Sequence, residues 1–243
     1  GKTGLAAIDA VYSFLKLPVN FFVGLSAGTT ILISQFFGAR DHSSLSRAVH
    51  TGIGFALAGG LALSVLGFLV APLCLKAMEV PRELFDGSLS YVRILFGGFA
   101  LSMLYNVGAG ILRAVGDSRT PFYVLIVAGG ANVVLDLVFV AIFKMNAPGA
   151  ALATVLAQGL SAVLVLRVLL RTRAPYKVCG AELRFDRAML YSICRIGLPV
   201  GLQSALYPVA NMMVQSGINR TGTDNIAAWA LCGKLDFMIW LIA

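Results

Sequence analysis

Residues 51–75 read TGIGFALAGGLALSVLGFLVAPLCL and contain no charged side chain. An α-helix rises about 1.5 Å per residue, so roughly 20 residues cross a hydrocarbon core of about 30 Å. The run is longer than this, and it lacks the alternation of apolar and polar residues that is typical of membrane β-strands. It therefore predicts a membrane-spanning helix.

Similar runs occupy much of the remaining chain. They are residues 17–39, 94–112, 120–143, 145–166 and 196–219. Only Asp136 interrupts the third of them, and a last apolar stretch, 226–243, carries Lys234 and Asp236. With 58% hydrophobic and 12% charged residues, the composition is that of a membrane protein. We expect an all-α, polytopic transmembrane helix bundle with six complete spans and a truncated seventh.

The basic residues indicate which span ends face the cytoplasm. If successive spans alternate in direction, the connections fall into two sets, and Lys and Arg concentrate on the cytoplasmic side. One set, near 40–50, 113–119 and 167–195, holds eleven Lys and Arg residues, against five in the other set. We expect the first set to be cytoplasmic. These connections account for most of the net charge of +8, so we predict no nucleic-acid partner.

One connection is longer than the others. It reads RTRAPYKVCGAELRFDRAMLYS, residues 171–192, and it is polar and basic. We interpret it as a cytoplasmic linker between an N-terminal lobe, residues 1–170, and the start of a C-terminal lobe, residues 193–243.

A polar pair interrupts the apolar run ANVVLDLVFV, residues 131–140. Asn132 and Asp136 are four residues apart, so their side chains lie on one face of a helix. An ionisable side chain within a span is costly and usually serves an ion or substrate pathway. The alternative is that Asp136 pairs with a basic residue, of which Lys144 is the nearest candidate, or that its side chain snorkels toward the membrane surface. We expect the functional role.

Residues suited to catalysis are scattered. The two histidines, His42 and His50, lie in one predicted connection, and the four cysteines show no metal-ligand spacing. We therefore predict neither an enzyme nor a resident cofactor.

Four motifs resemble one transporter family. GAGILRAVGDSRTP, residues 108–121, resembles the signature loop of the multidrug and toxic compound extrusion (MATE) family. ISQFFGARD at 33–41, GAALAT at 149–154 and RIGLPVG at 195–201 resemble further motifs of that family, in the same order. The resemblance covers essentially the whole chain. It implies the second to the truncated eighth helix of a twelve-helix, two-lobe transporter, with the first helix outside the chain.

The resemblance also implies a function. We expect a secondary active multidrug efflux antiporter. It would be a multi-pass protein of a bacterial or archaeal cell membrane that works as a monomer without a cofactor. It would export organic cations or amphipathic toxic compounds in exchange for H⁺ or Na⁺ by alternating access. The alternatives are a lipid-linked oligosaccharide flippase of the same superfamily and a membrane sensor that transports nothing.

Site residues follow from the DinF-like branch of that family. Asn132 and Asp136 match a pair on its fifth helix that forms part of a cation site, and Thr154 matches a Thr on its sixth helix. These three residues are the predicted coupling site, for H⁺ or for Na⁺. The resemblance implies one more Asp, on the first helix, outside the chain.

A second group of candidates lies in the last two spans. Gln203 and Tyr207 occupy the seventh helix, where the NorM-like branch of the family has an acidic residue and this chain has none. Lys234 and Asp236 lie on the truncated span. We predict that these four residues contribute to a substrate cavity or to coupling.

Overall fold

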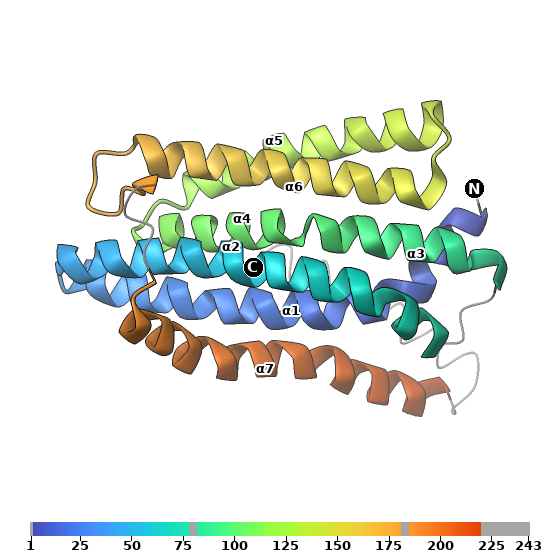
Figure 1. The fold of residues 1–243 in the computed structure, drawn as a ribbon, viewed down its shortest axis with the longest axis horizontal. Coiled ribbons are helices and arrows are strands. Elements are labelled where there is room, and N and C mark those ends of the chain that lie inside the picture. Colours follow the sequence, from blue (N-terminus) through green and yellow to red (C-terminus); the bar gives the residue numbers. More distant parts are fainter. Residues whose placement is uncertain (1, 78–81, 181–184, 220–243) are drawn as a thin grey trace.

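The computed structural model describes residues 2–77, 82–180 and 185–219, and these form an elongated bundle of helices without a strand (Figure 1). The helices are α1 (Lys2–Gly38), α2 (His42–Ala77), α3 (Arg82–Gly97), α4 (Phe99–Ala114), α5 (Arg119–Asp136), the π-helix η1 (Leu137–Ile142), α6 (Asn146–Arg171) and α7 (Arg187–Asn219). The predicted all-α fold is confirmed.

The described residues include four helices that are long and apolar enough to cross a membrane, or five if a bent pair counts as one span. The four are Pro18–Gly38, His42–Lys76, Arg119–Ile142 and Asn146–Arg171. The predicted span 196–219 is helical within α7. The stretch 226–243 lies outside the described residues, so the count of six spans and a truncated seventh stays a prediction.

The connections gather at the two ends of the bundle. Those between α1 and α2, α4 and α5, and α6 and α7 lie at one end, at the left of Figure 1, which we call the basic end. The connection between η1 and α6, which holds Lys144, lies at the opposite end, called the far end. The described connections of the two sets are therefore separated in space along the bundle axis.

Two helices begin earlier than predicted: α7 begins at Arg187, inside the predicted linker 171–192, and α2 begins before its apolar run. Residues 42–50 were expected in a connection, but α2 already begins at His42. The Ser44 N–H donates to Asp41 Oδ1 at 3.0 Å, which satisfies a donor in the first turn of the helix. Hydrogen bonds from the side chain and the backbone of Ser44 lower the pKa of Asp41. The capped helix thus extends beyond its apolar run.

The predicted span 94–112 is longer than expected and is broken. Phe85–Gly97 and Phe99–Ala114 meet at an angle of 43°. At the break, a Cβ atom on Gly98 would lie 2.5 Å from Val155 Cγ2 of α6. Only glycine permits this approach, so the bend and the contact with α6 occur together.

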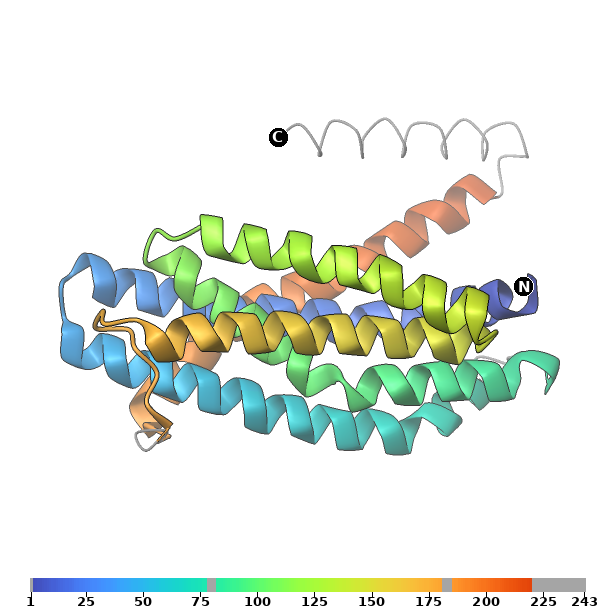
Figure 2. The same cartoon turned by 90° about the horizontal axis from the view of Figure 1, so that it is seen from above.

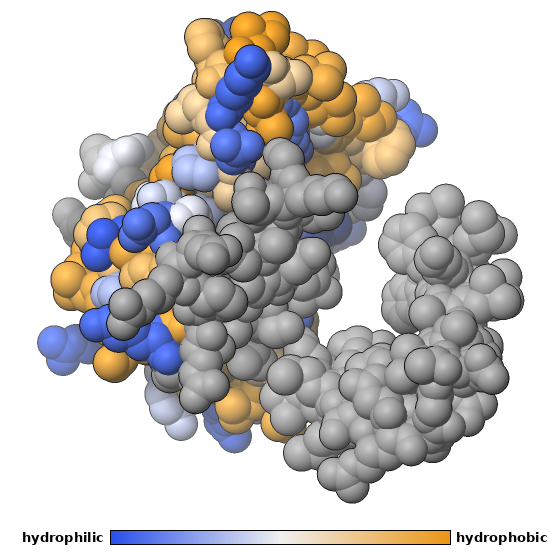
Figure 3. All heavy atoms as spheres, turned by 90° about the vertical axis from the view of Figure 1, so that its right-hand side faces the viewer, coloured by the Kyte–Doolittle hydropathy of each residue, from blue (hydrophilic) through white to orange (hydrophobic). Residues whose placement is uncertain are grey.

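The apolar surface of the bundle faces outward as well as inward. Side chains from α1, α2, α4 and α6 form the main buried cluster, whereas most apolar side chains of α5 are exposed. Figure 3 looks onto the far end and shows apolar side chains over the sides of the bundle. A bilayer solvates such surface as readily as a protein core does, so the exposed apolar residues are those expected of membrane helices.

Candidate cation and substrate site

Asn132 and Asp136 lie one turn apart near the end of α5. Asp136 is its last residue, and η1 follows directly. Short π-helical turns within helices occur frequently at functional sites, and the sequence did not predict this one. It widens the helix immediately after the carboxylate.

Both side chains present buried polar atoms without a partner. Among the described residues, neither Asn132 Nδ2 nor Asp136 Oδ1 has a hydrogen-bond partner, although both atoms are buried. The only ion pair in the described ranges joins Arg47 to Asp186, so Asp136 does not pair with Lys144. Structural pairing of Asp136 with Lys144 is therefore wrong, and the other alternative, a snorkelling side chain, is not tested by this contact. A buried polar atom without a partner is costly, and ligand binding would remove that cost.

Thr154 approaches the same region from α6, which packs along α5 (Figures 1 and 2). Its hydroxyl donates to the Ala150 carbonyl of its own helix at 2.9 Å. This bond uses the single proton and leaves a lone pair of the oxygen free to accept or to coordinate.

Asn132 and Thr154 line one cavity of about 330 Å³ between α4, α5 and α6. Its other polar lining residues are Ser102, Tyr105 and Asn106 of α4 and Gln158 and Ser161 of α6. No charged side chain is among the lining residues, and Asp136 itself lies just outside the lining, one turn further along α5. The cavity wall therefore carries polar groups but no charge.

A smaller cavity of about 160 Å³ adjoins the first. Both are lined by Ser102, Thr154 and Gln158. The smaller one also has aromatic walls from both sides of the bend at Gly98, namely Tyr91, Phe96 and Phe99. The broken span thus places the α3 and α4 aromatic side chains around a space that reaches the predicted coupling residues.

The donor set favours a hard cation or a proton. Carboxylate, amide and hydroxyl oxygens suit Na⁺ and similar ions, whereas transition metals prefer nitrogen and sulfur ligands. In the part of the chain that the structure describes, no group of three or more His, Cys, Asp or Glu side chains is placed to hold a metal ion.

The second group of predicted site residues lies mostly outside what the structure describes. Gln203 is exposed on α7. Tyr207 belongs to the same helix, but its side chain, like Lys234 and Asp236, lies outside what the structure describes. A contribution of these four residues to a substrate cavity stays a prediction.

Sequence reasoning missed much of the cavity wall. Thr154, Gln158 and Ser161 follow at intervals of four and three residues, which aligns them on one face of a helix. Ser102, Tyr105 and Asn106 form the same kind of stripe on α4. Two polar stripes in apolar helices were a usable signal.

The comparisons identify the family. The sequence model of the MatE family matches residues 1–138, which is more than half of the chain. The chain belongs to the MATE family.

Relatives and solved structures agree with this assignment. The chain is 31% identical over 97% of its length to the probable multidrug resistance protein YoeA of Bacillus subtilis, and 25% identical over 93% to the multidrug export protein MepA of Staphylococcus aureus. It spans 52% and 49% of those proteins, about half of each. A crystal structure of MATE in the bent conformation has the same fold, with a TM-score of 0.88 and 24% identity over 98% of this chain and 54% of the other.

Membership of the MATE family gives the general class of protein. MATE proteins are multi-pass transporters of the cell membrane, and they are not enzymes. The lipid bilayer and small-molecule substrates are the partners that this family implies.

Proposed function

We propose that the intact protein is a secondary active multidrug efflux antiporter, which exports organic cations or amphipathic compounds in exchange for H⁺ or Na⁺. One observation carries the proposal: a buried carboxylate oxygen and a buried amide nitrogen without partners lie beside a polar cavity. The names of YoeA and MepA support the substrate class.

In this proposal Asp136 is the coupling group. Its negative charge is costly within a span, and either a proton or Na⁺ neutralises it. A proton would bind the carboxylate directly, while Na⁺ would also use the amide oxygen of Asn132 and the hydroxyl oxygen of Thr154. Both modes neutralise the same charge, so the residues are compatible with either ion.

Substrate would use the cavities. Their walls combine aromatic faces with uncharged hydrogen-bonding groups, which suits amphipathic molecules with delocalised positive charge. Coupling requires that the cation and the substrate stabilise different arrangements of the protein, since a ligand shifts an equilibrium only through its differential affinity.

The proposal includes a two-lobe organisation, with residues 1–170 in one lobe, 171–192 as the linker and 193–243 at the start of the other. In support, the segment between α6 and α7 is largely non-helical in its described part. A single copy would be the working unit.

The flippase alternative has less support. A lipid-linked oligosaccharide carries a pyrophosphate group, so its binding site calls for basic side chains. Neither cavity is lined by Lys or Arg. Transport of an anionic lipid is therefore not our proposal, and no observation favours a sensor that transports nothing.

The test replaces Asp136 by Asn in the intact protein, which keeps the size of the side chain and removes its charge. We expect ion-driven efflux of a cationic dye from cells, or uptake of the dye into everted vesicles, to fall to the level measured in cells or vesicles without the protein. Asp117→Asn, in the loop before α5, is the matched control and should retain most of the transport. Full transport by Asp136→Asn would refute the coupling role. Dye transport driven by a pH gradient alone, compared with transport driven by a Na⁺ gradient alone, identifies the coupling ion.

A further inference from the structure

Helices α1 and α7 make an unusually close contact through paired glycines. Gly24 and Gly28 of α1 face Gly201 and Gly197 of α7. A Cβ atom on Gly24 would lie 2.6 Å from Gly201 Cα, and one on Gly28 would lie 2.7 Å from the Gly197 nitrogen. On both helices the glycines are four residues apart, the spacing that lets membrane helices bring their backbones together.

The contact lies toward the basic end. Gly197 follows ten residues after the first residue of α7, Arg187, so it is about 15 Å along that helix. Beyond the crossing, α7 moves away from the bundle toward its last described turns (Figure 2). The two helices are thus in contact near the basic end and apart near the far end.

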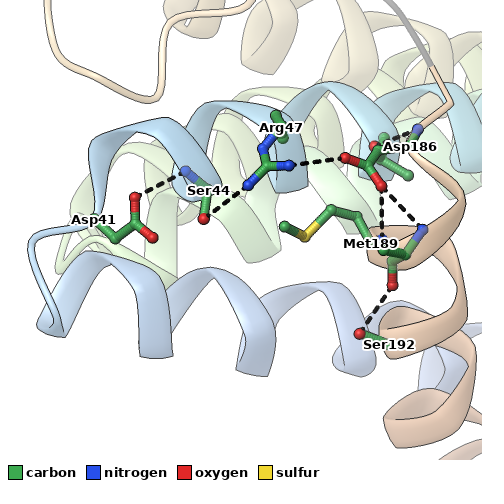
Figure 4. Close-up of polar contacts among 8 residues, drawn as sticks. Asp41, Ser44, Arg47, Asp186, Met189 and Ser192 are labelled. Atoms are coloured by element: carbon green, nitrogen blue, oxygen red, sulfur yellow. Dashed lines mark hydrogen bonds and ion pairs between the residues drawn. The ribbon is translucent and has the colours of Figure 1, made fainter.

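A polar network ties the start of α7 to α2 (Figure 4). Arg47 donates from one guanidinium nitrogen to Asp186 Oδ2 at 3.2 Å and from the other to Ser44 Oγ at 3.1 Å. Asp186 Oδ1 accepts from the backbone N–H groups of Ala188 and Met189, at 2.9 and 3.2 Å. One carboxylate therefore caps α7 and holds it to α2.

Neighbouring residues of α2 secure the same connection. The Asp186 N–H donates to Thr51 Oγ1 at 3.3 Å, and the Cys179 N–H donates to His50 Nε2 at 2.9 Å. His50 and Thr51 lie three and four positions after Arg47, so the three residues form one face of α2. That face binds both described ends of the connection between α6 and α7.

We propose that the glycine contact and the Arg47–Asp186 ion pair form a clasp that closes the basic end of the transporter, and that the ion pair releases when that end opens. The glycines act as the pivot on which α7 rotates against α1, and the ion pair acts as the latch. The side chains of Arg47 and Asp186 are 53% and 25% exposed. An ion pair this accessible is weak, so it can break and form again in each cycle. The inference rests on the proposed alternating-access function and adds the residues that set the balance between its states.

The test measures distances in the intact protein in nanodiscs. Spin labels are placed at Ser43→Cys and Tyr191→Cys, two exposed positions at the basic end on α2 and α7. The native cysteines are replaced by serine, and pulsed electron paramagnetic resonance gives the populations of short and long distances. Gly197→Ala overpacks the pivot and should raise the ratio of long to short distances on the order of tenfold.

Asp186→Asn tests the latch without removing the helix cap, because Asn is as good a capping residue as Asp. It should also increase the long-distance population, by a smaller factor. Gly130→Ala, at a helical glycine with nothing within 4 Å, and Arg187→Gln, at an exposed arginine without an ion pair in the described ranges, are the matched controls. Both should leave the distances as in the parent.

Parent-like distances in Gly197→Ala would refute the pivot, and parent-like distances in Asp186→Asn would refute the latch. The measurement needs no transport. A protein that opens and closes as described but never moves a dye would overturn the proposed function and leave the clasp supported.

Discussion

Gly98→Ala is expected to destabilise the protein, while the same change at the neighbouring Gly97 is not. The two glycines are adjacent at the bend between α3 and α4. A Cβ atom at position 98 would lie 2.5 and 2.6 Å from the two methyl carbons of Val155, whereas one at position 97 has nothing within 4 Å. The pair therefore separates the effect of packing from the effect of helix propensity.

The size of the effect follows from the overlap. Carbon atoms pack best at about 3.5–4.0 Å, so the new methyl group would penetrate its neighbours by roughly 1 Å. Val155 is branched at Cβ and has few alternative rotamers in a helix, so it cannot move both methyl groups away. Overpacking of this kind costs about 1–3 kcal/mol. At Gly97 the only expected change is the greater helix propensity of Ala, a gain of at most about 1 kcal/mol.

The assay is thermal unfolding of the purified protein in detergent, followed by intrinsic fluorescence. One kcal/mol corresponds to about 2–4 °C in a domain of 150–250 residues. Gly98→Ala should therefore lower the unfolding temperature by a few degrees, and Gly97→Ala should leave it unchanged or slightly raised. Val155→Ala removes both obstructing methyl groups, so the double variant should be less destabilised than the sum of the single variants.

Two results would contradict the reasoning. Equal unfolding temperatures for Gly97→Ala and Gly98→Ala would mean that α6 does not approach the bend as closely as described. Strict additivity of Gly98→Ala and Val155→Ala would mean that Val155 is not the obstacle.

Two further predictions concern Thr154 and Asp117. Thr154→Val keeps the shape of the side chain and removes its oxygen, so Na⁺-driven efflux should fall at least several-fold. Thr154→Ser keeps the hydroxyl and should retain the efflux. Equal efflux in the two variants would exclude coordination by the hydroxyl. Desolvation raises the pKa of Asp117, but hydrogen bonds from the Thr120 hydroxyl and N–H outweigh it, at 2.6 and 3.0 Å, and the pKa is lowered. The stabilisation is complete above the unfolded value of about 3.9 and is lost as the pH falls through the lowered pKa. Unfolding temperatures recorded from pH 7 downward should therefore fall less steeply for Asp117→Asn than for the parent, and parallel curves would contradict this.

The candidate site was predictable where its geometry is local. Asn132 and Asp136 share a helical face because of their spacing, and the cost of a charge in a bilayer marks Asp136 for function. The bend at Gly98 was not predictable in the same way, because Gly59-Gly60 and Gly129-Gly130 are similar pairs within unbroken helices. Gly98 packs against Val155 of α6 at a break, whereas Gly60 packs against the Ala100 backbone of α4 within a continuous helix, so the place of the bend depends on how the helices pack.

Hydropathy and charge act residue by residue along the chain, so they were enough to predict a bundle of membrane helices and the ends that carry the basic connections. The polar residues that share a cavity, the break in a span, and the meeting of Gly24 and Gly28 with Gly201 and Gly197 became visible only in the packed bundle. Those facts depend on contacts between residues far apart in the chain. Close packing of backbones needs small residues at the facing positions of both helices, and the sequence of one helix does not reveal its partner.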